Sequence, residues 1–181
     1  MDELAVVRWL GGHGAAPLDW LAWLLGLGGR FGGLWLLLAL VGWTARRMKA
    51  AAVWQVILAL ILALVVVNVA VKPLADRSRP YELDAAVRVV GGRPLSSSFP
   101  SGHTASAFAA AVALSRGWPG GAGAWWTLAV LMALSRVYAG VHFPTDVAAG
   151  ALIGYLCGCL VVGRTAWYST NSASRASGVA R

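Results

Sequence analysis

Two histidines, an aspartate and three basic residues occur in three short clusters whose residue types suit phosphate chemistry. The clusters are KPLADRSRP at 72–80, FPSGH at 99–103 and SRVYAGVHFPTD at 135–146. Lys72, Arg79 and Arg136 bring three positive charges, and no matching set of carboxylates accompanies them. Such cations repel one another unless an anion neutralises them, and a phosphate accepts bidentate hydrogen bonds from arginine and a point-charge contact from lysine. The clusters therefore predict a phosphate-binding site.

The second cluster comes immediately before an alanine-rich apolar run, so we expect it to begin a helix. Ser101 can cap that helix, and Gly102 allows the backbone to approach a ligand closely. The first amide groups of a helix have no intrahelical partner and attract anions. His103 would then lie beside an anion-binding helix end.

The third cluster places His142 four residues before Asp146, with Pro144 suited to the first turn of a helix. This spacing lets the carboxylate contact one imidazole nitrogen and direct the other outward, as in triads that orient a base or nucleophile. The residues alone do not decide whether His103 or His142 is the nucleophile. Two histidines and an aspartate could also ligate zinc. Three nearby cations would oppose a divalent ion, so we expect no metal and no cofactor.

The composition indicates a single domain that lies in a membrane. Of 181 residues, 59% are apolar and 12% are charged, about half the charged share of an ordinary soluble domain. The net charge is +8, but the basic residues fall at the ends of apolar segments instead of along one polar face. We therefore expect a lipid bilayer as partner and no nucleic acid. The sequence makes no prediction of oligomeric state.

The apolar segments predict an all-α transmembrane bundle of five or six spans. The four clear segments are 50–71, 101–114, 125–140 and 146–162, and the segment 34–43 is apolar enough to cross if its flanks are included. Residues 1–30 are expected to form an N-terminal interfacial helix or a short first span, residues 31–164 the transmembrane core that carries the site, and residues 165–181 a polar tail. About 20 apolar residues are needed to cross a bilayer, and residues 17–29 fall short of this.

Alternating helix directions predict that the three clusters meet on one side of the membrane. The basic residues Arg46, Arg47 and Lys49 lie at the opposite side and are typical of a cytoplasmic anchor. We therefore expect a multi-pass protein of the inner (plasma) membrane whose site faces away from the cytoplasm. Three further arginines of the polar connection between the third and fourth spans, Arg77, Arg88 and Arg93, are expected to contact lipid headgroups.

The three clusters resemble the signature of the type 2 phosphatidic acid phosphatase superfamily, whose fold is shared with vanadium haloperoxidases. The signature is a lysine, six residues and Arg-Pro, then Pro-Ser-Gly-His, then Ser-Arg, five residues, His, three residues and Asp. It corresponds here to Lys72 with Arg79 and Pro80, to Pro100–His103, and to Ser135 and Arg136 with His142 and Asp146. Within the superfamily the chain is similar to small bacterial integral membrane lipid phosphatases.

The resemblance implies a role for each residue of the clusters. His142 would attack phosphorus to form a phosphohistidine, Asp146 would orient it, and His103 would protonate the leaving oxygen. The phosphate oxygens would be held by Lys72, Arg79, Ser101, Gly102 and Arg136. Catalysis would need no metal.

The resemblance also implies a lipid phosphate as substrate. Undecaprenyl diphosphate is our best expectation, followed by phosphatidylglycerophosphate, phosphatidate or a lipid A phosphate, and headgroup selectivity is expected in the loop 81–98. Two alternatives stay open. A lipid phosphotransferase would use the same phosphohistidine, whereas a non-catalytic lipid-phosphate-binding membrane protein would need the cations without the histidines.

Overall fold

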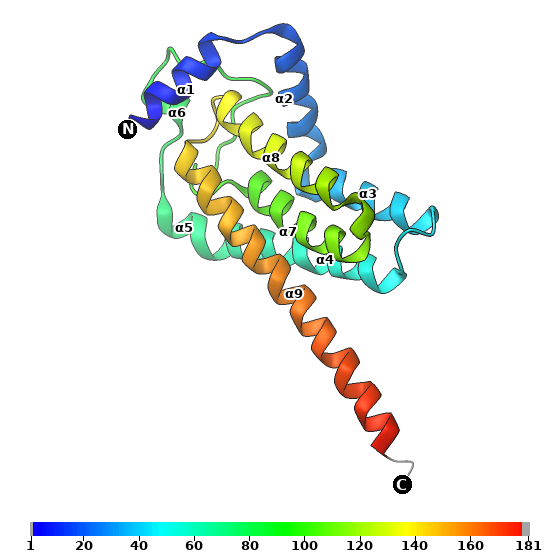
Figure 1. The fold of residues 1–181 in the computed structure, drawn as a ribbon. Coiled ribbons are helices and arrows are strands. Elements are labelled where there is room, and N and C mark those ends of the chain that lie inside the picture. Colours follow the sequence, from blue (N-terminus) through cyan, green and yellow to red (C-terminus); the bar gives the residue numbers. More distant parts are fainter. Residues whose placement is uncertain (1, 179–181) are drawn as a thin grey trace.

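The computed structural model describes the backbone of residues 2–178 and the side chains of residues up to 163. Within these residues the chain is helical and contains no strand, which confirms the predicted all-α class (Figure 1). The α-helices are α1 (Glu3–Gly12), α2 (Ala16–Gly28), α3 (Gly33–Thr44), α4 (Ala50–Val65), α5 (Lys72–Ala75), α6 (Pro80–Leu83), α7 (Gly102–Gly117), α8 (Ala122–Tyr138) and α9 (Pro144–Gly178). Shorter helical turns are η1 (Arg30–Gly32), the π-helical η2 (Val66–Val71) and η3 (Pro119–Gly121).

Helix α7 forms the centre of the bundle. It packs against α4, α8 and α9 (Figure 1), and nine of its sixteen residues are buried, six of them alanines. Small side chains let neighbouring helices approach closely, which is how helices associate in lipid, where apolar burial gives little driving force. The predicted alanine-rich span is therefore the core helix against which the site is assembled.

Three glycines at four-residue spacing bring α9 against α7. A Cβ atom at Gly150 would lie 2.5 Å from the carbonyl oxygen of Ser101, and one at Gly154 would collide with the carbonyl of Ala105. The third glycine, Gly158, is equally confined, with 2.7 Å between its hypothetical Cβ and the neighbouring side chain of α7. This contact joins the beginnings of α7 and α9, where two of the three sequence clusters lie.

Among the described residues, two helical segments are long and apolar enough to cross a membrane. They are Ala50–Leu83 and Pro144–Gly163, and the bent pair α2 and α3, which meet at 63°, would count as a third. Helices α7 and α8 are about 24–26 Å long, less than the roughly 30 Å of a hydrocarbon core. The structure supports a membrane protein, and the count of five or six spans stays a prediction.

The helices can be compared with the predicted organisation of the chain. Residues 1–30 contain two helices, α1 and α2. Lys72, the first residue of the first cluster, begins α5, which continues directly from η2. Helix α9 extends to Gly178, so the predicted boundary after residue 164 falls inside a helix. The side chains of the predicted tail at 165–181 lie outside the described residues, as do residues 179–181 altogether.

The three sequence clusters meet at one end of the bundle, as predicted. The amide of Ser101 at the start of α7 donates a 3.0 Å hydrogen bond to the carbonyl of Asp146 at the start of α9. Arg79, which directly precedes α6, donates from Nη1 to the carbonyl of Val141 at 2.7 Å. Residues separated by more than 40 positions therefore build one continuous site.

Candidate active site

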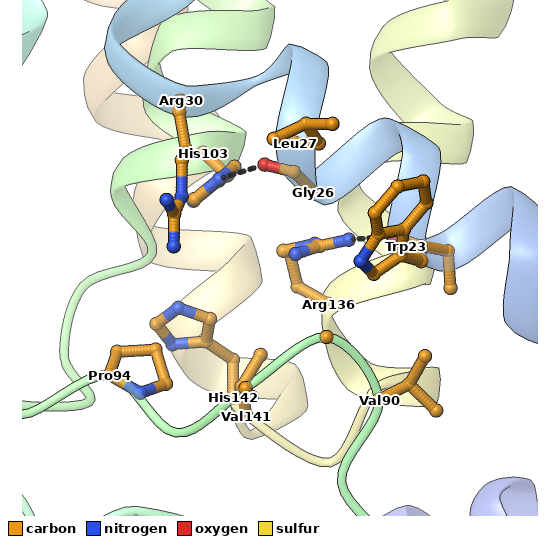
Figure 2. Close-up of a pocket in the computed structure, with 13 residues that line it drawn as sticks. Trp23, Gly26, Leu27, Arg30, Val90, Pro94, His103, Arg136, Val141 and His142 are labelled. Carbon is orange, nitrogen blue, oxygen red and sulfur yellow. Dashed lines mark hydrogen bonds between the residues drawn. The ribbon is translucent and has the colours of Figure 1, made fainter.

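A cavity of about 200 Å³ opens at this end of the bundle. Figure 2 shows His103, Arg136 and His142 facing it from α7, α8 and the turn before α9. Helix α2, the turn η1 and the segment 90–94 complete its wall. None of the 13 lining residues is acidic. A space bounded by cations and imidazoles, without a carboxylate, suits an anionic ligand.

Asp146 lies directly behind His142 and is completely buried. Its Oδ2 is 3.6 Å from Nδ1 of His142, which is too long for a hydrogen bond. The same oxygen accepts hydrogen bonds from the Ser98 hydroxyl at 2.6 Å and from the Phe143 amide at 2.8 Å. Nδ1 of His142 has no hydrogen-bond partner in the described part of the chain. The predicted His142–Asp146 pair is therefore present as an electrostatic contact.

Arg77 holds the other oxygen of Asp146. Its Nη1 donates to Asp146 Oδ1 at 2.6 Å and to the Thr145 hydroxyl at 2.7 Å. Its Nη2 donates to Glu3 at 2.7 Å. Arg77 was expected at lipid headgroups, and this expectation was wrong because both ends of its guanidinium are engaged by carboxylates. No sequence signal indicated this pairing, because Glu3 lies in α1, 74 residues away from Arg77.

His142 is 3% exposed, and this burial controls its protonation. Removal from water disfavours the charged imidazolium and lowers the pKa of His142 to about 4. The nearby carboxylate of Asp146 partly opposes this shift, while the charge of Arg79 adds to it. His142 is therefore neutral at pH 7. Its ring can offer a lone pair at the nitrogen that does not face Asp146.

Helix α2 covers the site and binds both His103 and Arg136 through backbone carbonyls. Nε2 of His103 lies 3.0 Å from the carbonyl oxygen of Gly26 (Figure 2). Nη2 of Arg136 donates to the carbonyl of Ala22 at 2.6 Å. A Cβ at Gly26 would come within 2.7 Å of Arg136, and one at Gly29 within 2.8 Å of His103. These glycines allow α2 to lie directly on the site, a role that the sequence clusters did not reveal.

Lys72 and Arg79 both donate hydrogen bonds to the hydroxyl of Ser96. The Ser96 hydroxyl accepts from Lys72 Nζ at 3.0 Å and from Arg79 Nη2 at 3.4 Å. The side chain of Arg79 is buried, and it also donates to the carbonyls of Ser96, Ser97 and Val141. Most donors of Arg79 are thus used to hold the loop, whereas the Lys72 ammonium keeps donors available for an anion.

Ser101 and Gly102 stand beside the cavity and do not line it. Ser101 occupies the N-cap position of α7, but its side chain makes no capping hydrogen bond, so that part of the prediction was wrong. Its hydroxyl instead accepts from Thr104 at 3.0 Å, and its amide is bonded to Asp146. Contact between Ser101 or Gly102 and a phosphate stays a prediction.

The two other arginines of the connecting loop are also engaged by protein groups. Arg88 forms hydrogen bonds of 2.7 and 2.8 Å with the carboxylate of Asp19, which raise the pKa of Arg88 above its ordinary value. The Tyr138 hydroxyl donates to the same carboxylate at 2.6 Å. The guanidinium of Arg93 lies 5.4 Å from the centre of the Tyr81 ring. The Arg88 contacts fasten the loop to α2 and α8, so its expected place at lipid headgroups was also wrong.

The donor chemistry around the cavity differs from that of a metal centre. Among the side chains described, no three His, Cys, Asp or Glu residues form a group that could hold a metal ion. Arg136 instead shares the cavity with the two histidines. The arrangement can bind an anion, offer a neutral imidazole to it and place a second imidazole nearby.

Comparison with known proteins shows the same family along most of the chain. Residues 52–169 match the PAP2 superfamily. A decaprenylphosphoryl-5-phosphoribose phosphatase of Mycobacterium tuberculosis is 39% identical over 131 residues, which cover 70% of this chain and 69% of the relative. An undecaprenyl-diphosphatase of Sulfolobus acidocaldarius is 35% identical over 103 residues, covering 54% of this chain and 48% of the relative.

Two solved structures share the fold. The crystal structure of Aquifex aeolicus LpxE is similar with a TM-score of 0.72 and 32% identity, over 88% of this chain and 94% of that one. A transmembrane PAP2-type phosphatidylglycerolphosphate phosphatase from Bacillus subtilis is similar with a TM-score of 0.69 and 25% identity, over 90% and 84% of the two chains.

Proposed function

The chain belongs to the PAP2 superfamily and is a phosphatase, and from this premise we propose that it hydrolyses a membrane lipid phosphate at the cavity of Figure 2. The observation that carries the proposal is the lining of that cavity. Two histidines and Arg136 face it, no carboxylate does, and Asp146 stands behind His142. This arrangement supports nucleophilic attack on a phosphate that is bound by cations.

In the first step the neutral nitrogen of His142 attacks phosphorus. A P–N bond forms while the bond between phosphorus and the leaving oxygen breaks, and the electrons of that bond stay on the oxygen. The attacking ring becomes positively charged, and the Asp146 carboxylate 3.6 Å from Nδ1 stabilises this charge. The low pKa of His142 supports this role, because the lone pair is free at neutral pH.

His103 is placed to supply the proton that the leaving oxygen needs. It shares the cavity with His142, and its Nε2 faces the Gly26 carbonyl. Arg136 and Lys72 would hold the non-reacting oxygens and stabilise the negative charge that develops on them. The positive charge of Arg79, whose donors hold the loop, would add to this electrostatic stabilisation. In the second step, water attacks phosphorus and gives its proton to His103, the P–N bond breaks, and inorganic phosphate leaves.

The proposal also includes the lipid substrate and the side of the membrane at which the site opens. We take undecaprenyl diphosphate first and phosphatidylglycerophosphate, phosphatidate or a lipid A phosphate next. The names of an undecaprenyl-diphosphatase and a phosphatidylglycerolphosphate phosphatase among the similar proteins support the first two. The site would open at the extracytoplasmic face of the plasma membrane, opposite the basic turn of Arg46, Arg47 and Lys49.

The test is phosphate release by purified protein in neutral detergent from a panel of these four lipids. His142→Ala should abolish release. His13→Ala is the matched control, because this third histidine is exposed, contacts the Trp9 carbonyl and does not line the cavity. Equal rates for wild type and His142→Ala would overturn the mechanism. Transfer of phosphate to an added acceptor lipid, without free phosphate, would replace hydrolysis by phosphotransfer.

A further inference from the structure

A second cation besides Arg136 lines the cavity and lies outside the three sequence clusters. Arg30 begins η1, the turn between α2 and α3. The backbone of this turn is left-handed at Phe31 and Gly32, with φ of 51° and 80°, and the two helices meet there at 63°. Figure 2 shows the Arg30 side chain directed into the space beside His103 and above His142.

Arg30 differs from the other cations at this end of the bundle because its charge is unused. Carboxylates, hydroxyls or carbonyls accept hydrogen bonds from Arg8, Lys72, Arg77, Arg79, Arg88 and Arg136, and Arg93 contacts the Tyr81 ring. Among the described residues, the Arg30 side chain has no hydrogen bond, ion pair or ring contact, and only its backbone carbonyl is bonded, by the Gly33 amide. No acidic residue lines the cavity to neutralise it. An unpaired guanidinium in such a space is a binding group for a second anion.

The position of Arg30 indicates which part of a substrate would carry this second anionic group. In the proposed mechanism His103 gives its proton to the leaving oxygen, so the leaving group lies on the His103 side of the phosphorus. Arg30 is on that side, next to His103 (Figure 2). The alcohol released from a simple phosphate monoester such as phosphatidate is neutral and has no use for a guanidinium. The leaving group of a lipid diphosphate is itself a phosphate.

We propose that Arg30 binds the inner phosphate of a lipid diphosphate, which makes diphosphates the preferred substrate class of the proposed phosphatase. His142 would attack the terminal phosphorus, and the bond between that phosphorus and the bridging oxygen would break. Its electrons stay on the bridging oxygen, which becomes an oxygen of the lipid monophosphate product and takes the proton from His103. Negative charge grows on the inner phosphate during this step, and Arg30 stabilises it.

This inference rests on the proposed function. One pair of substrates distinguishes a failure of the inference from a failure of the proposed function. Farnesyl diphosphate and farnesyl monophosphate carry the same tail and differ only in the inner phosphate. Wild type and Arg30→Gln are compared on both in neutral detergent free of phospholipid. We expect kcat/KM to fall about tenfold or more on the diphosphate and less than about threefold on the monophosphate. On the diphosphate, kcat/KM of Arg30→Lys should lie between those of wild type and Arg30→Gln, because the lysine ammonium keeps the charge but cannot form the two parallel hydrogen bonds of a guanidinium.

Arg47→Gln is the control for loss of a cation in general. Arg47 is exposed in the α3–α4 connection, near the far end of α7, about 24 Å from the His103 end. It should behave as wild type on both substrates. Equal losses by Arg30→Gln on the two substrates, or none on the diphosphate, would overturn the inference. A loss that appears only after anionic phospholipid is added would also overturn it, by assigning Arg30 to a neighbouring headgroup. A wild type that releases phosphate from neither substrate refutes the proposed function itself.

Discussion

Arg77 and Asp146 form an ion pair of 2.6 Å behind the cavity, between Nη1 and Oδ1. The pair leaves Oδ2 of Asp146 directed toward His142, where Ser98 and the Phe143 amide also hold it. Arg77 therefore fixes the carboxylate and withdraws part of its charge from the imidazole. We regard Arg77 as a positioning residue that acts on His142 through Asp146.

Replacing Arg77 by Gln should lower kcat about 10- to 100-fold, the usual effect of losing a charge-assisted hydrogen bond. KM should change little, because Arg77 does not line the cavity. The unneutralised carboxylate would also favour imidazolium, so the acid limb of kcat/KM should move to higher pH. Arg77→Lys should restore part of kcat, and Arg93→Gln, which removes only a ring contact, should not affect it. An unchanged pH profile would contradict the positioning role.

His103 should matter most when the leaving group is poor. A lipid alkoxide needs a proton in the transition state, whereas para-nitrophenolate leaves without one. His103→Ala should therefore lower kcat/KM on phosphatidate about 10²- to 10⁴-fold and much less on para-nitrophenyl phosphate. Steady-state rates on both substrates provide the measurement. If both rates fall by the same factor, His103 binds phosphate instead of supplying a proton.

Acid should destabilise the protein through His142. The pKa of His142 is about 4 in the fold and near 6.5 when unfolded, so the unfolded chain binds more protons between these values. Stability must then fall as pH decreases from 6.5 to 4, by roughly 3 kcal/mol at most. Thermal unfolding in detergent should show a smaller decline of Tm over this range for His142→Gln than for wild type. Parallel declines would mean that another group is responsible.

The convergence of the three clusters was predictable because helices in a bundle alternate in direction, and the spacing of His142 and Asp146 indicated their contact. The role of α2 was not predictable. Its carbonyls reach Arg136 and His103 only because Gly26 and Gly29 have no side chains and α2 bends into α3. That proximity depends on packing between distant helices.

Arg77 is a second example of a residue whose contacts could not be deduced from the sequence. It lies within the first cluster, at 72–80, yet its partners are Glu3 and Asp146. The sequence indicated an exposed arginine near a membrane surface, since a loop cation without a neighbouring carboxylate usually faces solvent or headgroups. Which carboxylate it meets depends on where α1 and α9 are placed.

Catalysis should continue in excess EDTA and stop with vanadate. The proposed steps use His142, His103 and cationic side chains, and vanadate can adopt the five-coordinate geometry of the phosphoryl-transfer transition state. Inhibition should weaken strongly in Arg136→Gln, which removes a cation of the cavity. Loss of activity with EDTA that added Mg²⁺ or Zn²⁺ restores would refute the metal-free mechanism.

The side of the membrane on which the site opens can be tested with single cysteines. Leu95 lies in the site loop and is fully exposed, and Ala45 is exposed in the α3–α4 connection beside Arg46 and Arg47. Each would be changed to Cys in a background in which Cys157 and Cys159 are Ala. A membrane-impermeant maleimide applied to intact cells should label Leu95→Cys and reach Ala45→Cys only after permeabilisation.

The reverse labelling pattern would place the site in the cytoplasm. The expected pattern follows from the basic turn at Arg46, Arg47 and Lys49, because such turns are retained on the cytoplasmic side of spanning segments. The site residues are also basic, so charge alone divides the two faces weakly. The contacts made by Lys72, Arg79 and Arg136 support the expected orientation, because they commit these cations to the site and leave the basic turn as the expected cytoplasmic anchor.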